Sequence, residues 1–513
     1  MKEKYNVLLI LEGTYPFNGG GVSTWAHMLC NQVKNVNYTL YSINANYEVK
    51  SKYELSVNVK EVIQVPLWSP LEPEEILENG NKYHQFVAKK ENDDDAYIAQ
   101  IFLPRFEQFI SAIYTPIRNL EYIDQIIFEM WQFFQKHDYK KTMKSVLVWN
   151  AFCRILSGII ESEKEQEVTL YDLTVGMRWL YRFLLPLSID VPKVDISHLT
   201  VSGFPIIPAL VLKYKYGIPI IATEHGVFIR ERLLAINASE YSFFLKKLLI
   251  KLSECITELV YYKADLILSV NQFNISWEKL YGANTDKIEV IYNGIDHQLF
   301  VPGPKPEYLR GTPTVVAAAR IFELKDVITM IRSCDIVRKV IPNVKYLVYG
   351  DNTAVPEYTE ECEKLIQELN LQDNFKLAGF HQNPHLLFLE GDISILTSIS
   401  EGFPYTVLES MSCGIPVVST DVGGVYEALD DKCGYLCKPK DFVAIGNRVI
   451  ELLQNDTLRL QMGKYARNKV IENFTIGKFI KEYEIAYDKV MNNGVLDVKK
   501  SILIQLKNHQ EAS

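Results

Sequence analysis

The chain has 513 residues, of which 48% are hydrophobic and 23% charged, and 54 basic against 63 acidic residues give a net charge of −9. This composition is ordinary for a globular protein, and the acidic balance argues against general nucleic-acid binding, which needs a basic surface. A single hydrophobic core rarely exceeds about 250–300 residues, so the length predicts two domains.

The N-terminal segment begins the first predicted domain. Residues 1–5 run directly into the apolar strand 6–11 without a signal-peptide pattern, and no window approaches the roughly 18 apolar residues of a membrane span. The glycine-rich turn Gly19-Gly20-Gly21 and a helix over 22–33 follow, as at the start of doubly wound α/β domains. We therefore expect a cytoplasmic protein, with docking at the inner face of a membrane left open.

The pattern changes between about residues 66 and 190. Aromatic residues are dense there and charges are interspersed, which indicates a mostly helical insertion into the first domain. Residues 89–95 (KKENDDD) are typical of a solvated loop inside it.

Strands and helices alternate again on both sides of a linker at Pro302–Pro306, which is rich in proline and glycine. Short apolar runs predict buried parallel strands over 218–223, 265–270, 288–292, 314–319, 344–349, 392–396 and 415–419. Charges interrupt the segment 243–268, as in an amphipathic helix, and a long helix over 476–491 ends the pattern.

These elements predict an α/β protein with two Rossmann-like domains whose parallel sheets face each other across a cleft. We place the domains at 1–302 and 303–475 and expect the helical segment 476–513 to complete the first. Eight cysteines are scattered, and the closest pair, Cys433 and Cys437, has no further ligands nearby, so we expect reduced thiols rather than a metal site.

The most specific motif spans Ser400–Gly424, directly after the predicted strand 392–396. Glu401 lies on the turn at the carboxyl end of that strand, where open α/β sheets bind ligands, and Gly402 lets a ligand approach the backbone. The next residues lead into a helix whose first free N–H groups favour a phosphate. They are Phe403, Pro404, Tyr405, Thr406 and Val407.

A second carboxylate, Glu409, lies eight residues after Glu401, about one turn inside this helix. Two acceptor-only carboxylates beside an anion-binding helix start suit hydroxyl groups at the two ends of a ligand, one on a sugar and one on a ribose. Taken alone, each glutamate is more simply a surface charge or a partner of the helix dipole. The combination of Glu-Gly-Phe-Pro, Cys-Gly-Ile-Pro and Gly-Gly is much rarer than its parts.

Arg320 and Lys325 follow the predicted strand 314–319 and form a second candidate site. Both can supply counter-charges to a diphosphate leaving group without a metal, although an exposed pair on a loop is the simpler interpretation. No Asp-x-Asp follows a strand in the C-terminal half, so we expect no metal requirement.

The N-terminal half holds two further candidates. Gly19-Gly20-Gly21 lets a loop pack against a substrate, but it is not the Gly-x-Gly-x-x-Gly fingerprint of dinucleotide binding. His225 follows a strand end beside Gly226 and is placed to meet a ligand, while a capping or core histidine is an equally good interpretation. His198 is a weaker candidate of the same kind.

Together these motifs resemble those of the GT-B fold glycosyltransferases of family 4, over nearly the whole chain and most clearly between Val315 and Gly434. The resemblance implies that the domain 303–475 binds the nucleotide sugar and that the domain 1–302 serves the acceptor. It also implies a role for each candidate: Glu401 would meet the donor sugar, Glu409 the ribose, and Arg320 with Lys325 the diphosphate. Gly19 to Gly21 would lie near the donor phosphate and acceptor, and His225 would be the active-site histidine of the first domain.

Two departures from the family are visible: Asp326 follows Lys325 where glycine is usual, and the aromatic-rich insertion is long. The segments Leu11–Trp25 and Thr223–Arg232 are similar, more narrowly, to glycosyltransferases of exopolysaccharide synthesis. This implies a retaining transfer from a UDP-sugar to a growing glycan, without cofactor or metal, beside an inner-membrane assembly. A UDP-sugar 2-epimerase of the same plan, a weakly catalytic nucleotide-binding scaffold and, more distantly, an NAD-linked oxidoreductase are the alternatives.

Overall fold

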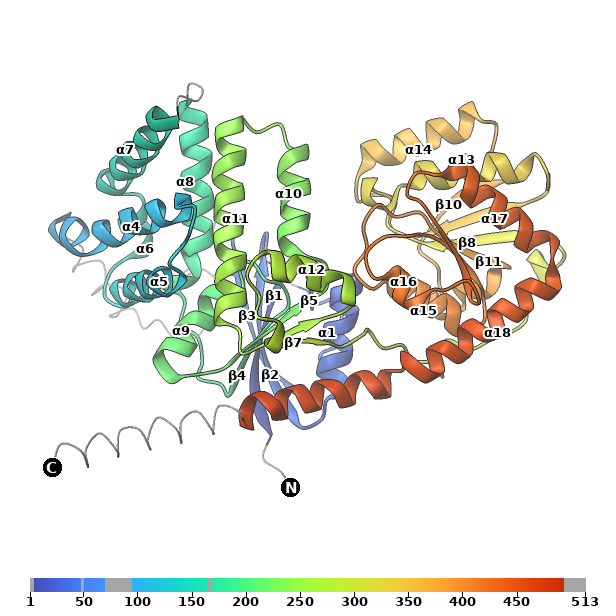
Figure 1. The fold of residues 1–513 in the computed structure, drawn as a ribbon, viewed down its shortest axis with the longest axis horizontal. Helices are drawn as coiled ribbons and strands as arrows, with labels where there is room; N and C mark the ends of the chain where they lie inside the picture. The colour runs from blue at the N-terminus through green and yellow to red at the C-terminus, as the bar shows by residue number, and fades with distance from the viewer. Residues whose placement is uncertain (1–3, 48–49, 70–94, 164–167, 493–513) are drawn as a thin grey trace. The chain divides into compact units, whose positions relative to one another are not determined.

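The computed structural model describes residues 4–47, 50–69, 95–163 and 168–492 (Figure 1). The described chain forms two compact units. Unit 1 contains the residues up to Ser269, then Ile275–Glu289 and the residues from Tyr483 on, and unit 2 contains Val270–Asn274 and Val290–Glu482. Residues 290–302, which we had placed in the first domain, thus belong to unit 2.

Unit 1 is built on a seven-stranded sheet in the order β3-β2-β1-β4-β5-β6-β7, and the pairs from β3 to β6 are parallel. The strands are β1 (Tyr5–Glu12), β2 (Val36–Asn44), β3 (Val59–Pro66), β4 (Ile196–Leu199), β5 (Ile220–Glu224), β6 (Leu266–Ser269) and β7 (Ile288–Val290). The predicted strands in this half are confirmed, with ends shifted by one or two residues.

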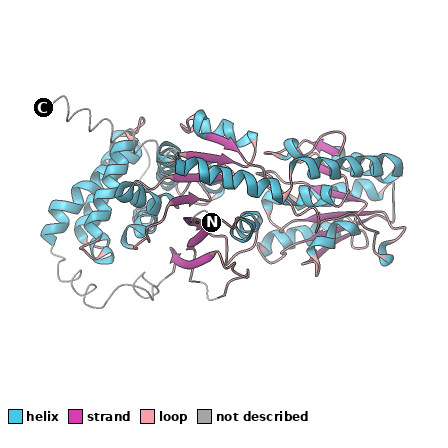
Figure 2. Cartoon of the chain, turned by 90° about the horizontal axis from the view of Figure 1, so that it is seen from below, coloured by secondary structure: helices cyan, strands magenta, loops and turns pink. Residues whose placement is uncertain are grey.

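The helical insertion is confirmed over the described residues, and Figure 2 shows how rich in helix this part of the chain is. It contains α3 (Asp95–Tyr97), α4 (Leu103–Tyr114), α5 (Leu120–Phe134), α6 (Tyr139–Met143), α7 (Val146–Glu163) and α8 (Leu170–Leu184). A capping box starts α8, because Thr169 and Asp172 each bind the other's backbone N–H. Of the predicted loop 89–95, only Asp95 is described, and it begins α3.

The other helices of unit 1 follow its strands, as expected for parallel connections. They are α1 (Gly21–Gln32), α9 (Ile206–Tyr216), α10 (Phe228–Ala238), α11 (Phe243–Lys263) and α12 (Gln272–Leu280), the last of which begins in unit 2. The predicted amphipathic helix is α11, and most of its apolar residues are buried in the core of unit 1. In the part of the chain that the structure describes, no helix is long and apolar enough to cross a membrane.

Unit 2 has a six-stranded sheet in the order β10-β9-β8-β11-β12-β13, and all its described pairs are parallel. The strands are β8 (Thr314–Ala318), β9 (Lys345–Tyr349), β10 (Phe375–Gly379), β11 (Ile393–Leu396), β12 (Val417–Thr420) and β13 (Gly434–Cys437). The helices are α13 (Val327–Arg338), α14 (Pro356–Glu368), α15 (Tyr405–Ser412), α16 (Val425–Ala428), α17 (Phe442–Gln454) and α18 (Asp456–Asn473). The prediction of an α/β fold with two parallel sheets is confirmed.

Residues 476–492 are helical, and the part from Tyr483 on packs into unit 1. Trp25 Nε1 donates a hydrogen bond of 3.0 Å to the Tyr483 hydroxyl, and the Tyr487 hydroxyl lies 2.8 Å from His198 Nδ1. All four side chains are fully or almost fully buried. These contacts hold the last described helix against β4 and α1.

Candidate functional site

The site in unit 2 is assembled from the loops that follow β8, β11 and β12. These strands are neighbours, and the chain order reverses between β8 and β11, which is where open parallel sheets bind ligands. The loops are tied together, since Ile399 N donates to Leu324 O at 2.8 Å and Gly424 N donates to Gly402 O at 2.9 Å. The hydroxyl of Thr420 adds a bond of 2.6 Å to Ser398 O.

At the centre of these loops, Lys325 forms an ion pair with Glu401. The Ser398 hydroxyl donates a second hydrogen bond, of 2.5 Å, to the same carboxylate oxygen. The side chains are 21% and 10% exposed, so the pair is shielded but still reaches the surface. The structure thus brings together the lysine predicted for the diphosphate and the glutamate predicted for the sugar, while Ser398 was missed because a serine after a strand carries no signal of its own.

Arg320 lies on the exposed surface of the loop after β8. Its guanidinium carbon is 5.0 Å from the ring centre of Phe322, and no described carboxylate pairs with it. An arginine held over an aromatic ring without a counter-ion is positioned to bind an anion.

The segment 403–407 contributes to the site through its backbone. The Phe403 side chain is 4% exposed and packs between Tyr292 and Phe474, and Tyr405 and Val407 are also buried. Pro404 is the N-cap of α15 rather than its first residue, and no side chain caps the helix. The side chains of this segment therefore hold the loop in the core, and a phosphate could meet only the first N–H groups of α15.

Glu409 is half-buried on α15, and no described group donates a hydrogen bond to it. Burial raises the pKa of its carboxyl group to about 7. A half-buried carboxylate without a donor is a ready acceptor for ligand hydroxyl groups.

The structure explains how aspartate can stand at position 326, directly after Lys325, where glycine is usual. Its φ is 45°, in the left-handed region, where most residues other than glycine are strained. The side chain compensates by capping α13, because its oxygens accept bonds of 3.2 Å from Thr329 N and 2.7 Å from Thr329 Oγ1. Aspartate therefore keeps the turn after Lys325 that glycine would allow.

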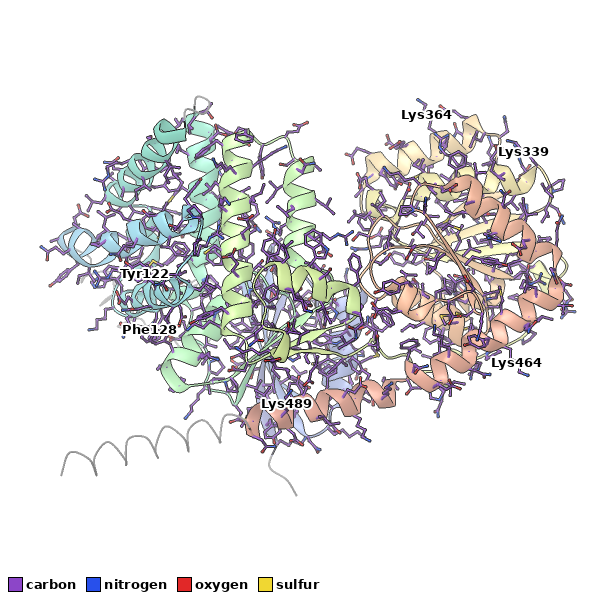
Figure 3. The ribbon with its side chains drawn as sticks, in the orientation of Figure 1. Tyr122, Phe128, Lys339, Lys364, Lys464 and Lys489 are labelled. Atoms are coloured by element: carbon purple, nitrogen blue, oxygen red, sulfur yellow. The ribbon has the colours of Figure 1, made fainter. Side chains whose placement is uncertain are left out.

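We predict that Arg320→Ala and Lys325→Ala each weaken UDP binding at least about tenfold, because losing a hydrogen bond to a charged group costs roughly 1.5–3 kcal/mol. Titration calorimetry with UDP measures the effect. Lys339→Ala, which removes an exposed lysine of the same unit labelled in Figure 3, is the matched control and should leave affinity unchanged. Unchanged affinity in both test variants would remove them from the site.

In unit 1, Gly19, Gly20 and Gly21 are exposed; Gly19 and Gly20 precede α1, and Gly21 is its first residue. Gly20 has a φ of 138°, and no side chain caps α1. No described side chain therefore caps the first N–H groups of α1, at the carboxyl edge of the sheet. The role of this loop in approaching a ligand stays a prediction.

The two histidines of unit 1 differ in their contacts. His198 is fully buried, and both its ring nitrogens are bonded, to the hydroxyls of Tyr487 and Thr223, each at 2.8 Å. His225 is half-buried, packs edge-on against Trp25 at 4.7 Å, and its Nε2 has no partner among the described residues. Burial lowers the pKa of each to about 3, so both rings are neutral near pH 7. His198 is a core residue, whereas His225 keeps a nitrogen for another contact.

Buried carboxyl groups should make the stability of unit 1 fall at alkaline pH. Burial raises the pKa of Glu224 to about 8 and of Glu278 to about 7, so their favourable contribution is lost as the pH rises through these values. Between pH 6.5 and 8.5 we expect the Tm to fall, and Glu278→Gln to reduce the fall by about 2–4 °C, the effect of about 1 kcal/mol in a domain of this size. Thermal melts at both pH values test this, and an equal fall in the variant would contradict it.

Comparison with known families matches both halves of the chain. Residues 5–286 match a family described as a domain of unknown function (DUF3492), and residues 305–469 match the glycosyl transferases group 1. The N-acetyl-alpha-D-glucosaminyl L-malate synthase of Bacillus anthracis is 27% identical over 238 residues, which cover 45% of this chain and 61% of that enzyme. The match therefore spans less than two thirds of the relative.

Solved structures with the same fold include a complex with UDP and glucose and a sucrose-phosphate synthase. HepE of Anabaena in complex with UDP and glucose is 14% identical with a TM-score of 0.57, covering 94% of this chain and 99% of the other. Sucrose-phosphate synthase from Thermosynechococcus elongatus is 14% identical with a TM-score of 0.60, covering 96% of this chain and all of the other. At these identities the likeness concerns the fold, which is of the GT-B type with two Rossmann-like domains.

Proposed function

The chain belongs to the DUF3492 family and carries a group 1 glycosyltransferase region, and from this we propose that it is a retaining glycosyltransferase that uses a UDP-sugar donor. The observation that carries the proposal is the cluster at the carboxyl edge of the second sheet. It combines the Lys325–Glu401 pair, the unpaired Arg320, the uncapped start of α15 and the unpartnered Glu409.

Each group of the cluster suits one part of a nucleotide sugar. Arg320, Lys325 and the first N–H groups of α15 would hold the diphosphate, whose negative charge grows as the sugar bond breaks. Glu401 would accept hydroxyl hydrogens of the sugar, and Glu409 those of the ribose. In unit 1, the neutral ring of His225 would donate or accept a hydrogen bond at the sugar, and the loop Gly19–Gly21 would approach the phosphate or the acceptor.

The leaving group would be stabilised by cationic side chains and backbone dipoles, so the proposed reaction requires no metal or cofactor. The test is to incubate the full chain with a panel of UDP-sugars, with and without EDTA, and to measure UDP release. We expect release with at least one donor, unaffected by the chelator. Loss with EDTA and rescue by Mg²⁺ or Mn²⁺ would overturn this assignment of the phosphate site, and binding of UDP without release from any donor would favour a scaffold.

Substitution of Glu409 and substitution of Glu401 should have different effects on binding and turnover. We predict that Glu409→Ala weakens both UDP and UDP-sugar by about tenfold or more, because it removes a charged hydrogen-bond acceptor. Glu401→Ala should bind UDP nearly normally and lose turnover. Calorimetry measures binding and UDP release measures turnover, and Glu409→Gln is the variant of equal size. The reverse behaviour would mean that Glu401 contacts the nucleotide and Glu409 the sugar.

The narrower resemblance of Leu11–Trp25 and Thr223–Arg232 extends the proposal to PelF, the cytosolic glycosyltransferase of Pel exopolysaccharide synthesis. The acceptor would then be a growing exopolysaccharide, and the enzyme would work beside an inner-membrane assembly. Product analysis tests this part: a lengthened glycan supports it, whereas conversion of the UDP-sugar into its epimer without an acceptor would replace it by the 2-epimerase reaction.

A further inference from the structure

A second cluster of polar and aromatic side chains lies in unit 1, at the carboxyl edge of its sheet. Trp68 follows β3, Phe204 follows β4, and Trp179 belongs to α8 of the helical insertion. Trp68 and Trp179 meet edge to face with 4.7 Å between ring centres, and Trp179 stacks on Phe204 at 6.2 Å. Trp68 is 40% exposed, so this aromatic surface opens to solvent.

Two arginines flank the indole rings. The Arg232 guanidinium lies 5.1 Å from the ring centre of Trp179, and Arg182 donates a bond of 3.2 Å to the carbonyl oxygen of Ser69, next to Trp68. Neither is paired with a described carboxylate. Nε of Arg232 and both Nε and Nη1 of Arg182 are buried without a hydrogen-bond partner. Buried N–H groups are rarely left without an acceptor in native proteins, so three such groups on the arginines that flank the tryptophan pair indicate a ligand that supplies oxygen atoms.

Glu12 completes the cluster from the end of β1. Its Oε2 atom is buried without a donor, and burial raises the pKa of the carboxyl group to about 7, while the charge of Arg232 opposes this shift. Glu12 ends β1 and Phe204 follows β4, and the chain order of this sheet reverses between these two strands. The cluster therefore occupies the position where a parallel sheet binds its ligand.

These groups match one class of ligand, a saccharide. A pyranose ring has an apolar face that packs on an indole, and its hydroxyl oxygens both accept hydrogen bonds from guanidinium groups and donate them to a carboxylate. We propose that Trp68, Trp179, Arg182, Arg232 and Glu12 form the acceptor-binding platform of the enzyme and take a saccharide. The claim that this saccharide is the acceptor rests on the proposed function. Binding of a saccharide to the platform can be tested without any turnover.

The test uses the full chain and measures tryptophan fluorescence and saturation-transfer NMR with three probes: cellohexaose, chitohexaose and hexagalacturonic acid. We expect at least one to bind, and the panel separates neutral, N-acetylated and acidic saccharides. Trp68→Ala and Trp179→Ala should each weaken that binding at least about tenfold, equivalent to about 1.4 kcal/mol. Arg232→Lys should weaken it as well, because lysine cannot reproduce the planar donor fork.

Trp131→Ala is the matched control, since Trp131 packs on α5 against Phe128, which Figure 3 labels, and should bind the probe as the wild type does. Trp68 is partly exposed, so Trp68→Ala keeps the test decisive if Trp179→Ala fails to fold. UDP affinity should be normal in every variant that folds. Failure of all three probes to bind the wild type, or unchanged binding in both tryptophan variants, overturns the platform.

The two proposals fail in different ways. Saccharide binding that depends on Trp68 and Trp179, with no UDP released from any donor, would keep the platform and remove the transferase. Turnover of a UDP-sugar without saccharide binding that depends on the two tryptophans would keep the transferase and remove the platform.

Discussion

Gly423→Ala is expected to abolish nucleotide binding by unit 2. Gly423 has a φ of +56°, and a Cβ atom there would lie 1.8 Å from the carbonyl oxygen of Glu401 and 2.8 Å from its carbonyl carbon. Two backbone segments cannot share this space, so the loop after β11 must move, and with it the start of α15 and the position of Lys325, which is paired with Glu401. These are proposed diphosphate contacts. We expect UDP affinity to fall at least about hundredfold, equivalent to about 2.7 kcal/mol.

Titration calorimetry with UDP and a thermal melt together measure this effect. The melting temperature should also fall, because the strained left-handed conformation disfavours alanine. Gly477→Ala is the control within the same unit, since Gly477 is exposed and a Cβ there would meet no atom within 4 Å. If Gly423→Ala bound UDP normally, the loops after β11 and β12 would not form the nucleotide site.

His225→Ala is expected to lower kcat by about 10²–10³, the usual cost of losing one preorganised contact to the transition state. His225 keeps a buried Nε2 without a partner, and its neutral ring can form a hydrogen bond with a sugar hydroxyl that strengthens as charge builds on the sugar. UDP affinity should stay normal, because the proposed diphosphate site lies in unit 2. Stopped assays of UDP release at saturating donor measure kcat.

His198→Ala is the matched control for this prediction. His198 is fully buried and bonded at both nitrogens, so its removal should lower the melting temperature strongly while the folded fraction turns over normally. His225→Ala loses only the edge contact with Trp25 and should melt closer to the wild type. If the two variants behave alike, with low melting temperatures and normal turnover, His225 is a structural residue.

Local pattern was sufficient to predict several central strands, because a strand that is buried on both faces is often a continuous apolar run. β1, β5, β6, β8 and β11 all have this character and were predicted within two residues. β3, β10 and β13 were not predicted, since they are edge strands whose less buried positions interrupt the apolar run. The central strands β2 and β4 were also not predicted, since polar residues interrupt both of them. The helical nature of the insertion was also predictable from its aromatic and charged composition.

The sequence by itself determined which residues of unit 2 are the candidates for a ligand site, because motifs such as Glu-Gly-Phe-Pro are rare and follow strand ends. Only the tertiary structure decided how these residues pair. Lys325 and Glu401 are 76 positions apart, and their ion pair exists because β8 and β11 are neighbours in the sheet. The same structure shows that Phe403 and Tyr405 are core residues and that Asp326 keeps a left-handed turn.

The saccharide platform of unit 1 is the clearest case of information that no linear pattern contains. Trp68, Trp179 and Arg232 lie in three separate segments and share no motif. They meet because β3, β5 and the insertion helix α8 bring their ends to one edge of the sheet, and strand order is set by long-range packing rather than by local periodicity.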